Sequence, residues 1–223
     1  MRDVVKAEEG ETFDIELEAN LLKANEQLAE RNKKLLSRNG VVAVDVMGSI
    51  GAGKTSLIEQ LVKRLKERHH IAVLNGDLTT TIDADILGQH GIPVVQINTG
   101  KECHLDANLV EKALKKLELE KLNLIFIENV GNLICPAEFP LGSEKRIVVI
   151  SLTEGPYIVV KHPYSFLHAD AVVINKVDLA DAMGLDIEKL KEDIRRLNPK
   201  VKLVETNCRT GDGVAKVADA LGL

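Results

Sequence analysis

Residues 41–55 read Val41-Val42-Ala43-Val44-Asp45-Val46-Met47-Gly48-Ser49-Ile50-Gly51-Ala52-Gly53-Lys54-Thr55, an apolar strand followed by the pattern G-x-x-x-x-G-K-T. A helical pattern comes next, which is the context that a phosphate-binding loop requires. Glycines at 48, 51 and 53 permit positive φ angles, so backbone N–H groups and the following helix N-terminus can point at an anion. The stretch predicts a nucleotide-phosphate site.

The residues around this loop receive specific predicted roles. Lys54 supplies a positive charge to the β- and γ-phosphates, and the Thr55 hydroxyl is placed to bind Mg²⁺. A glycine-rich turn with a solvated lysine is the alternative, but it leaves the glycine spacing unexplained. The predicted nucleotide-binding residues of the loop are Gly48, Ser49, Gly51, Ala52, Gly53, Lys54, Thr55 and Ser56.

Composition limits the class of protein. The 223 residues are sufficient for one α/β domain with an appendage, and the net charge of -5 argues against nucleic acid held by general electrostatics. No apolar run approaches the length of a membrane span, and the N-terminal residues show no signal-peptide core. The three cysteines are therefore expected to be reduced thiols in the cytoplasm, with no membrane partner.

The chain before the loop predicts a tail over residues 1–12 and one helix over 13–38, which ends at Asn39-Gly40. An apolar stripe of this helix could pack on the chain's own domain, the interpretation we favour, or on a partner. The stripe consists of Leu17, Leu21, Ala24, Leu28 and Leu35.

The remainder alternates between strand and helix patterns. Strands are predicted at 41–47, 71–74, 94–97, 124–127, 146–151, 171–174 and 202–204, with helices at 54–68, 82–90, 106–120, 187–197 and 214–221. Near-continuous apolar strands in this alternation predict a mostly parallel sheet covered by helices on both faces. Functional residues should gather at the carboxyl ends of its strands.

The tetrapeptide Asn175-Lys176-Val177-Asp178 directly follows one predicted strand. An ionised Asp178 accepts hydrogen bonds from the N1–H and amine of guanine, whereas adenine would leave it unpaired. Asn175 more plausibly ties this loop to the phosphate loop than reads the base, and the Lys176 stem can lie over the base plane. The pattern favours GTP over ATP, against the alternative of a polar turn.

Acidic residues end two other strands. Glu128-Asn129-Val130-Gly131 resembles the E-x-x-G switch of GTPases, in which the acid holds Mg²⁺ through water and the glycine N–H meets the γ-phosphate. Asp77 is the second acid expected near the metal, with Asp83 as a further candidate. Asp77 and Asp83 could instead be helix N-capping carboxylates.

Two cysteines and a histidine form a candidate site for a softer metal. Cys103-His104 precedes the helix at 106, and Cys135 comes four residues after Gly131. Such ligands suit Zn²⁺ or Ni²⁺ better than Mg²⁺, although buried packing cysteines are the commoner case. Residues 128–131 are called here the phosphate-sensing segment. If Cys135 moves with this segment, nucleotide binding and metal binding are coupled. Because one chain supplies too few ligands for a closed site, a nucleotide-dependent dimer with metal between its halves is predicted.

The chain resembles the HypB family of hydrogenase nickel-incorporation GTPases, in the metallochaperone group that includes UreG. The motifs themselves predict a P-loop GTPase domain over 40–223 after a tail and helix at 1–39, with Lys54, Asp77, Glu128 and Gly131 in catalysis. The resemblance implies GTP-promoted homodimers, Ni²⁺ or Zn²⁺ on Cys103, His104 and Cys135, and GTP hydrolysis used to deliver nickel to the hydrogenase large subunit with other maturation proteins. The matching segments are V-D-V-M-G-S-I-G-A-G-K-T, G-D-x5-D-A, N-T-G-K-E-C-H-L-D-A, F-I-E-N-V-G-N-L-I-C-P, T-E-G, K-H-P at Lys161 and N-K-V-D.

The chain departs from the family pattern in two places, and other functions are alternatives to nickel delivery for hydrogenase. No cysteine precedes Cys103, so a separate nickel store is not expected, and Pro156 replaces the acidic residue that usually follows T-E-G. Cys208 could touch the base or fill space. A urease-type nickel GTPase, a GTPase switch without metal function and a nickel storage protein are the alternatives. No glutamine or arginine finger stands out beside the phosphate loop, so slow turnover is expected.

Overall fold

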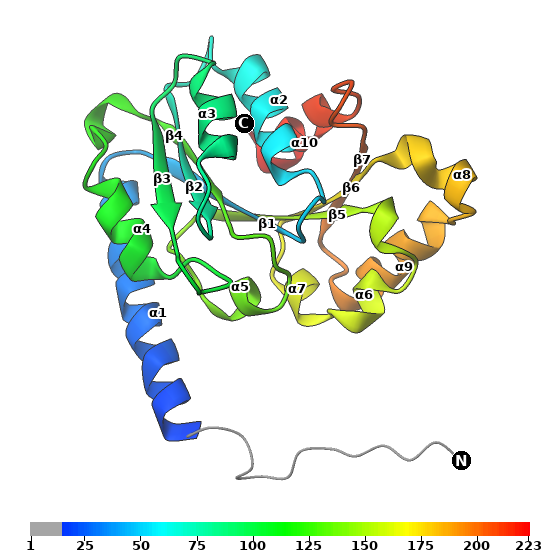
Figure 1. The fold of residues 1–223 in the computed structure, drawn as a ribbon, viewed down its shortest axis with the longest axis horizontal. Coiled ribbons are helices and arrows are strands. Elements are labelled where there is room, and N and C mark those ends of the chain that lie inside the picture. Colours follow the sequence, from blue (N-terminus) through cyan, green and yellow to red (C-terminus); the bar gives the residue numbers. More distant parts are fainter. Residues whose placement is uncertain (1–14) are drawn as a thin grey trace.

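The computed structural model describes residues 15–223 and forms one parallel sheet with helices on both sides (Figure 1). The predicted tail at 1–12 and the first residues of the predicted helix lie outside the described residues. The strands are β1 Val42–Gly48, β2 Ile71–Asp77, β3 Val94–Asn98, β4 Leu124–Glu128, β5 Lys145–Ser151, β6 Ala171–Asn175 and β7 Lys202–Thr206. The helices are α1 Ile15–Arg38, α2 Lys54–Leu65, α3 Ile82–Gly88, α4 Ala107–Leu114, α5 Cys135–Glu138, α6 Ile158–Lys161, α7 Tyr164–Leu167, α8 Ala180–Met183, α9 Ile187–Leu197 and α10 Val214–Leu221.

The sheet has the order β3-β2-β4-β1-β5-β6-β7, and neighbouring strands are parallel. β1, which leads into the phosphate loop, lies at the centre with β4 and β5 on its two sides. The α/β prediction is therefore confirmed. Because the strands are parallel, Glu128, Asp77 and Asn175 all lie at the same edge of the sheet, which is where ligands bind in such folds.

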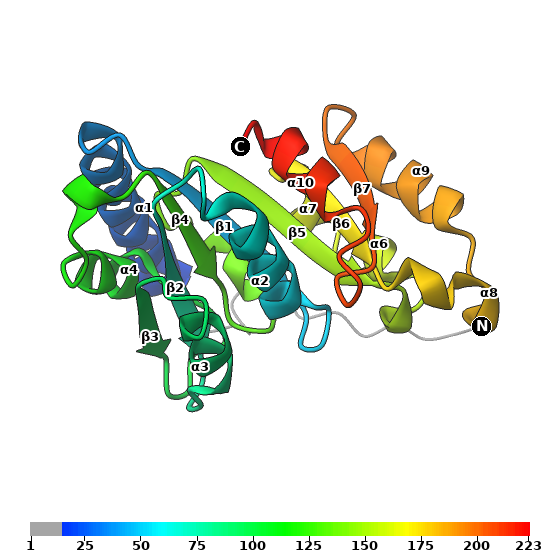
Figure 2. The same ribbon diagram turned by 90° about the horizontal axis from the view of Figure 1, so that it is seen from above.

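The two faces of the sheet are covered by different helices (Figures 1 and 2). Side chains alternate along a strand. Val44 and Val46 of β1 accordingly pack with α2, α3 and α10, while Ala43 belongs to the core beneath α1 and α4. A third apolar cluster joins β5 and β6 to α6, α7 and α9 on the same side as α1. Both faces are thus buried, as the continuous apolar strands predict.

Helix lengths differ from the prediction more than strand positions do. α2 ends at Leu65 rather than 68, and the helix predicted over 106–120 is α4, Ala107–Leu114, followed by the 3₁₀ turn Leu119–Lys121. The helices α5, α6, α7 and α8 were not predicted. Each is four residues long, too short to show a helical period.

The predicted buried face of α1 was wrong. Leu21 is 57% exposed, Ala24 is exposed, and Leu28 and Leu35 are half-buried; the side chain of Leu17 lies outside the described part. The face that packs on the domain carries Asn25, Ala29, Asn32 and Leu36, spaced three or four residues apart.

Hydrogen bonds from the buried asparagines attach α1 to its own domain. The Asn25 side chain accepts from the Ala107 N–H at 2.8 Å and donates to the Pro140 carbonyl at 2.9 Å. Asn32 donates to the carbonyls of Ala107 and Leu141 at 2.8 and 3.1 Å. These bonds compensate for most of the cost of burying two amides, although Asn32 Oδ1 has no hydrogen-bond partner among the described residues, and α1 packs on the domain, the interpretation we favoured. In residues 15–223, no helix combines the length and apolarity needed to cross a membrane.

Candidate nucleotide and metal sites

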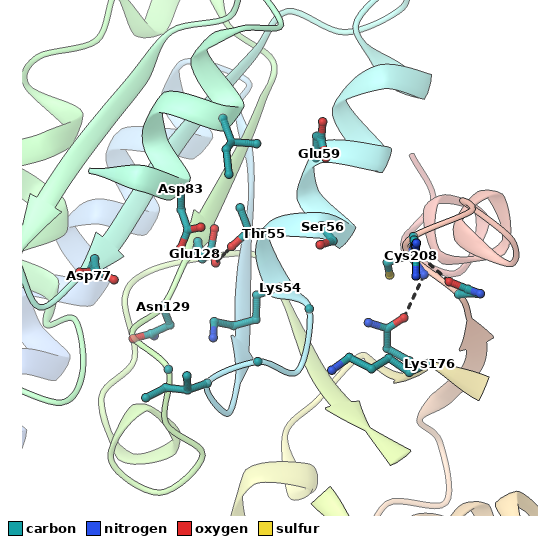
Figure 3. A pocket seen from close by; sticks show the side chains of 18 of the residues that line it. Lys54, Thr55, Ser56, Glu59, Asp77, Asp83, Glu128, Asn129, Lys176 and Cys208 are labelled. Carbon is teal, nitrogen blue, oxygen red and sulfur yellow. Dashed lines mark hydrogen bonds between the residues drawn. The ribbon is translucent and has the colours of Figure 1, made fainter. Parts of the chain in front are cut away.

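A cleft of about 650 Å³ opens at the carboxyl ends of the strands, a size typical of small-molecule sites. Figure 3 shows Lys54, Thr55 and Glu128 together on one side, with Lys176 and Cys208 on the other. Most predicted nucleotide residues line this one cleft: Gly51, Gly53, Lys54, Thr55, Ser56, Asp77, Glu128, Gly131, Asn175, Lys176 and Asp178. Gly48, Ser49 and Ala52 belong to the loop but do not line the cleft.

The phosphate loop is preformed. Gly53 is the N-cap of α2 with φ 102°, a left-handed conformation that favours glycine, and a Cβ there would collide with the Asn175 amide. The buried Lys54 ammonium donates to the carbonyls of Gly48 and Ser49 at 3.0 and 3.2 Å. Burial lowers the pKa of Lys54, and the nearby Glu128 carboxylate opposes that shift. The loop thus presents a cation and a helix N-terminus, which fits an anionic phosphate chain.

Glu128 is the most deeply buried acid of the cleft, with 3% exposure. Thr55 Oγ1 donates to its Oε1 at 2.6 Å and Asn75 Nδ2 donates to its Oε2 at 2.9 Å. Asn75 and Glu128 are register partners on β2 and β4, which explains this contact. Burial raises the pKa of Glu128 to about 7, although the Thr55 hydroxyl and Lys54 both oppose the shift. A carboxylate beside a threonine hydroxyl is the oxygen donor set that Mg²⁺ prefers.

Asp77 and Asp83 both line the cleft. Asp77 Oδ1 accepts from the N–H groups of Thr79 and Thr80 at 2.9 and 2.8 Å. Partial burial works to raise the pKa of Asp77, but these bonds outweigh it and the pKa lies below its usual value. Asp77 therefore stabilises the turn after β2. Neither acid is the N-cap of α3, because that position is Thr81.

Asn175 links the base side of the cleft to the phosphate loop, as predicted. Its Nδ2 donates to the Ala52 carbonyl at 2.9 Å, while its Oδ1 accepts from Cys208 N–H at 3.0 Å and from the Thr206 hydroxyl at 3.2 Å. The next residue, Lys176, has φ 61°, a left-handed conformation rare outside glycine. One buried amide thus fixes three loops around the cleft.

Cys208 lies at the boundary between the cleft and the core. The residue lines the cleft, but it is only 3% exposed and its thiol lies 3.5 Å from the Thr206 hydroxyl within the core beneath α10. Burial raises the pKa of this thiol above its usual value. Cys208 is therefore mainly a packing residue at the wall of the cleft.

The predicted metal ligands converge from two segments. One ligand atom each of Cys103, His104 and Cys135 lies within 4.8 Å of the other two, with the two sulfurs 2.9 Å apart. All three residues are half-buried, and the His104 ring packs on Phe139 with centroids 3.9 Å apart. Two thiols and one imidazole form a donor set for Zn²⁺ or Ni²⁺.

Protonation at this cluster follows from burial. Burial lowers the pKa of His104, opposed by carboxylates including Glu102, so its imidazole is neutral at physiological pH. Burial and the neighbouring Cys103 raise the pKa of the Cys135 thiol. Because a thiol must lose its proton to bind a metal, binding here releases protons.

The segment between the two sites touches the phosphate loop. Gly131 leaves no room for a Cβ, because that atom would collide with Ile50, and Asn132 forms a β-bridge with Gly48. Cys135 begins α5 three residues after Asn132. The chain thus runs from the acid Glu128, across the phosphate loop, to Cys135 of the candidate metal site.

Sequence reasoning missed several residues of the cleft. Glu59 lies one turn after Thr55 on α2, so helical spacing could have found it. Asn207 and Arg209 flank Cys208 in the loop after β7. Asn75, which donates to Glu128, belongs to no motif, and its contact follows only from the register between β2 and β4. The missed lining residues are Ile50, Glu59, Gly76, Ile86, Asn129, Leu179, Asn207 and Arg209.

Comparison with known proteins gives consistent relatives. Residues 42–205 match the model of the CobW/HypB/UreG nucleotide-binding domain. The probable hydrogenase maturation factor HypB of Methanocaldococcus jannaschii is 52% identical over 92% of this chain and 93% of that protein.

Two solved structures share the fold. The crystal structure of hydrogenase maturation factor HypB from Archaeoglobus fulgidus has a TM-score of 0.84 at 45% identity, covering 90% of this chain and 98% of that one. HypB from Helicobacter pylori in complex with nickel has the same TM-score at 35% identity, covering 89% and 93%. Together with the cleft, the loop and the Cys/His cluster, these matches show that the chain belongs to the CobW/HypB/UreG nucleotide-binding family, as a GTPase of its HypB hydrogenase-maturation branch.

Proposed function

We propose that this chain binds nickel at Cys103, His104 and Cys135 and uses GTP hydrolysis to release it for insertion into [NiFe]-hydrogenase. The observation that carries the proposal is the position of Cys135, seven residues after Glu128 on the segment that crosses the phosphate loop. A relative of 35% identity is described in complex with nickel, which supports the choice of metal. The large subunit and other maturation proteins are the proposed recipients and partners.

The ligand number suggests how the metal is passed on. Three ligand atoms leave at least one coordination position of a tetrahedral ion open. A second copy of the cluster, brought up in a GTP-promoted homodimer, would fill that position and hold the ion. Loss of the dimer after hydrolysis would open the site again. Zn²⁺ suits the same donors, so metal supply decides which ion occupies the site.

The cleft supplies the elements of phosphoryl transfer. We assign the β- and γ-phosphates to Lys54 and the loop amides, and guanine to Asp178 with Lys176 over its plane. Thr55, Glu128 and Asp77 are the proposed surroundings of Mg²⁺, which supplies charge neutralisation when bound. In this proposal the Gly131 N–H senses the γ-phosphate, and water attacks that phosphorus. In the described part of the chain no arginine other than Arg209 lines the cleft, so turnover is expected to be slow.

A single-turnover release experiment tests this function. The chain is loaded with Ni²⁺ and GTP, Mg²⁺ is added, and phosphate production is followed beside the transfer of nickel to a coloured chelator. Nickel is expected to leave with the phosphate, and Lys54→Ala should retain its nickel. His104→Ala should bind nickel poorly, whereas His70→Ala, which removes an exposed histidine elsewhere, should behave as wild type. Nickel that leaves at one rate with GTP and with a non-hydrolysable analogue would contradict the proposal.

A further inference from the structure

We propose that Asn129 is a positioning residue that transmits movement of the phosphate-sensing segment to the metal ligands. The inference rests on the proposed coupling of GTP to metal release and names the residues that perform it. These are Asp45, Asn129 and Arg146, called here the buried polar cluster. Asp45 and Asn129 have no exposed surface, and the Arg146 side chain is 14% exposed.

The pleat of β4 directs the side chains of Glu128 and Asn129 to opposite faces of the sheet. Side chains alternate between the two faces of a sheet, and the Asn129 N–H continues the ladder of β4 by donating to the Val46 carbonyl. Glu128 therefore reaches Thr55 on the α2 side, while Asn129 reaches Asp45 on the opposite side. Both residues line the cleft, but the Glu128 carboxylate bonds toward α2 while the Asn129 side-chain amide bonds toward the segment that carries Cys103 and His104.

The Asn129 side-chain amide forms three hydrogen bonds. Its Oδ1 accepts from the N–H of Leu105 and from its neighbour Val130, both at 3.0 Å, and its Nδ2 donates to Asp45 at 3.2 Å. Leu105 directly follows Cys103 and His104. One amide thereby joins the phosphate-sensing segment to the segment that carries two metal ligands.

Arg146 connects Asp45 to α5, the segment that carries Cys135. Arg146 is the register partner of Asp45 on β5, and its Nε donates to the Asp45 carboxylate at 3.0 Å. Its Nη1 also donates to the Ala137 carbonyl in α5, two residues after Cys135, at 3.4 Å. A continuous series of hydrogen bonds therefore runs from Leu105 through the buried polar cluster to Ala137. Its two ends lie in the two segments that carry the candidate metal ligands.

The consequence is a mechanical link. Hydrogen bonds in a buried, low-dielectric setting hold their geometry closely, since breaking one leaves a polar group without water. When Gly131 and its neighbours move to meet or leave a γ-phosphate, the Asn129 amide must move with them or lose its bonds. Either response displaces Leu105 relative to α5, which changes the distance between His104 and Cys135.

The experiment measures Ni²⁺ affinity of the full chain with a non-hydrolysable GTP analogue and with GDP. Wild type, Asn129→Ala and Arg146→Lys are compared with Asn198→Ala, a control that removes two comparable bonds, to the carbonyls of Phe166 and Ala169, away from both sites. The wild-type affinity ratio between nucleotide states is expected in the range of about 5 to 150. Asn129→Ala should bring this ratio, measured at saturating nucleotide, toward unity, and Asn198→Ala should keep the ratio.

The outcomes separate this inference from the proposed function. A wild-type ratio of unity would overturn both. A wild-type ratio preserved in Asn129→Ala would overturn the positioning role alone. If Asn129→Ala does not fold, Arg146→Lys decides: it keeps the positive charge for Asp45 but gives up the bond to α5, and it should lower the ratio. An unchanged ratio in a folded Arg146→Lys would then contradict the inference.

Discussion

At the scale of single residues, Asp45 is the side chain that strand pattern explains least. It is a fully buried carboxylate in the central strand, and burial raises its pKa while Arg146, its buried partner, opposes that rise. Removing one partner of a buried pair leaves a charge without compensation. Arg146→Met should therefore lower the free energy of unfolding by about 3 to 5 kcal/mol at neutral pH.

The same variant has a defined pH dependence. Without Arg146, the folded-state pKa of Asp45 rises further above its unfolded value, so the native state binds the proton more tightly. The loss of unfolding free energy relative to wild type is then complete above the folded-state pKa of Asp45 and becomes smaller as pH falls through that pKa. Urea unfolding at neutral and mildly acidic pH measures this. Arg196→Met, which removes an exposed pairing with Glu192, is the control and should show no such trend; equal deficits at both pH values in Arg146→Met would contradict the argument.

Base choice also belongs to one residue. Asp178→Asn replaces an acceptor-only carboxylate by an amide with one acceptor and one donor group, so it loses the acceptor for the C2 amine of guanine and matches the C2 carbonyl of xanthine instead. GTP affinity should fall roughly 10- to 100-fold, with xanthosine triphosphate binding gained. Competition against a fluorescent GTP analogue measures both. Unchanged selectivity would show that Asp178 does not read the base.

The sequence predicted those residues whose chemistry repeats in a motif: Lys54, Thr55, Glu128 and Asn175 all lie in the nucleotide cleft. It did not predict Asn75 or the pairing of Asp45 with Arg146, since these contacts depend on strand order and register. A polar residue in an apolar strand signals a buried partner, but not which partner.

At the scale of elements, α1 shows why periodicity alone gave the wrong face. Apolar spacing selected Leu21 and Leu28, yet Asn25 and Asn32 are buried because each finds backbone partners on α4 and the 140–141 loop. Strands were easier to predict, since those of a parallel sheet are apolar on both faces and register does not alter their pattern.

The attachment of α1 can be tested by one substitution. Asn32→Ala leaves the carbonyls of Ala107 and Leu141 without their donor, which should cost about 1 to 3 kcal/mol of local stability. Hydrogen exchange should then accelerate throughout α1. Asn20→Ala, which alters an exposed position of the same helix, is the matched control, and equal protection of the two variants would contradict the proposed attachment.

At the scale of the whole molecule, one stretch of chain, residues 128–135, connects the nucleotide cleft to the Cys/His cluster. Glu128 lines the nucleotide cleft, Asn129 belongs to the buried polar cluster, Gly131 packs on the phosphate loop, and the Cys135 thiol contacts that of Cys103. Linkage requires that if GTP changes the affinity for metal, metal changes the affinity for GTP by the same factor. A GTPase without metal function would show neither effect.

The most direct test of this coupling is the affinity for GTP analogue measured with and without saturating Ni²⁺, in wild type and in Cys135→Ser. The wild-type affinity should change by roughly fivefold or more on adding nickel, and the serine variant should lose that change while keeping its metal-free affinity. An equal effect of nickel in both proteins, or no effect in wild type, would contradict the claim that the phosphate-sensing segment and the metal site act as one device.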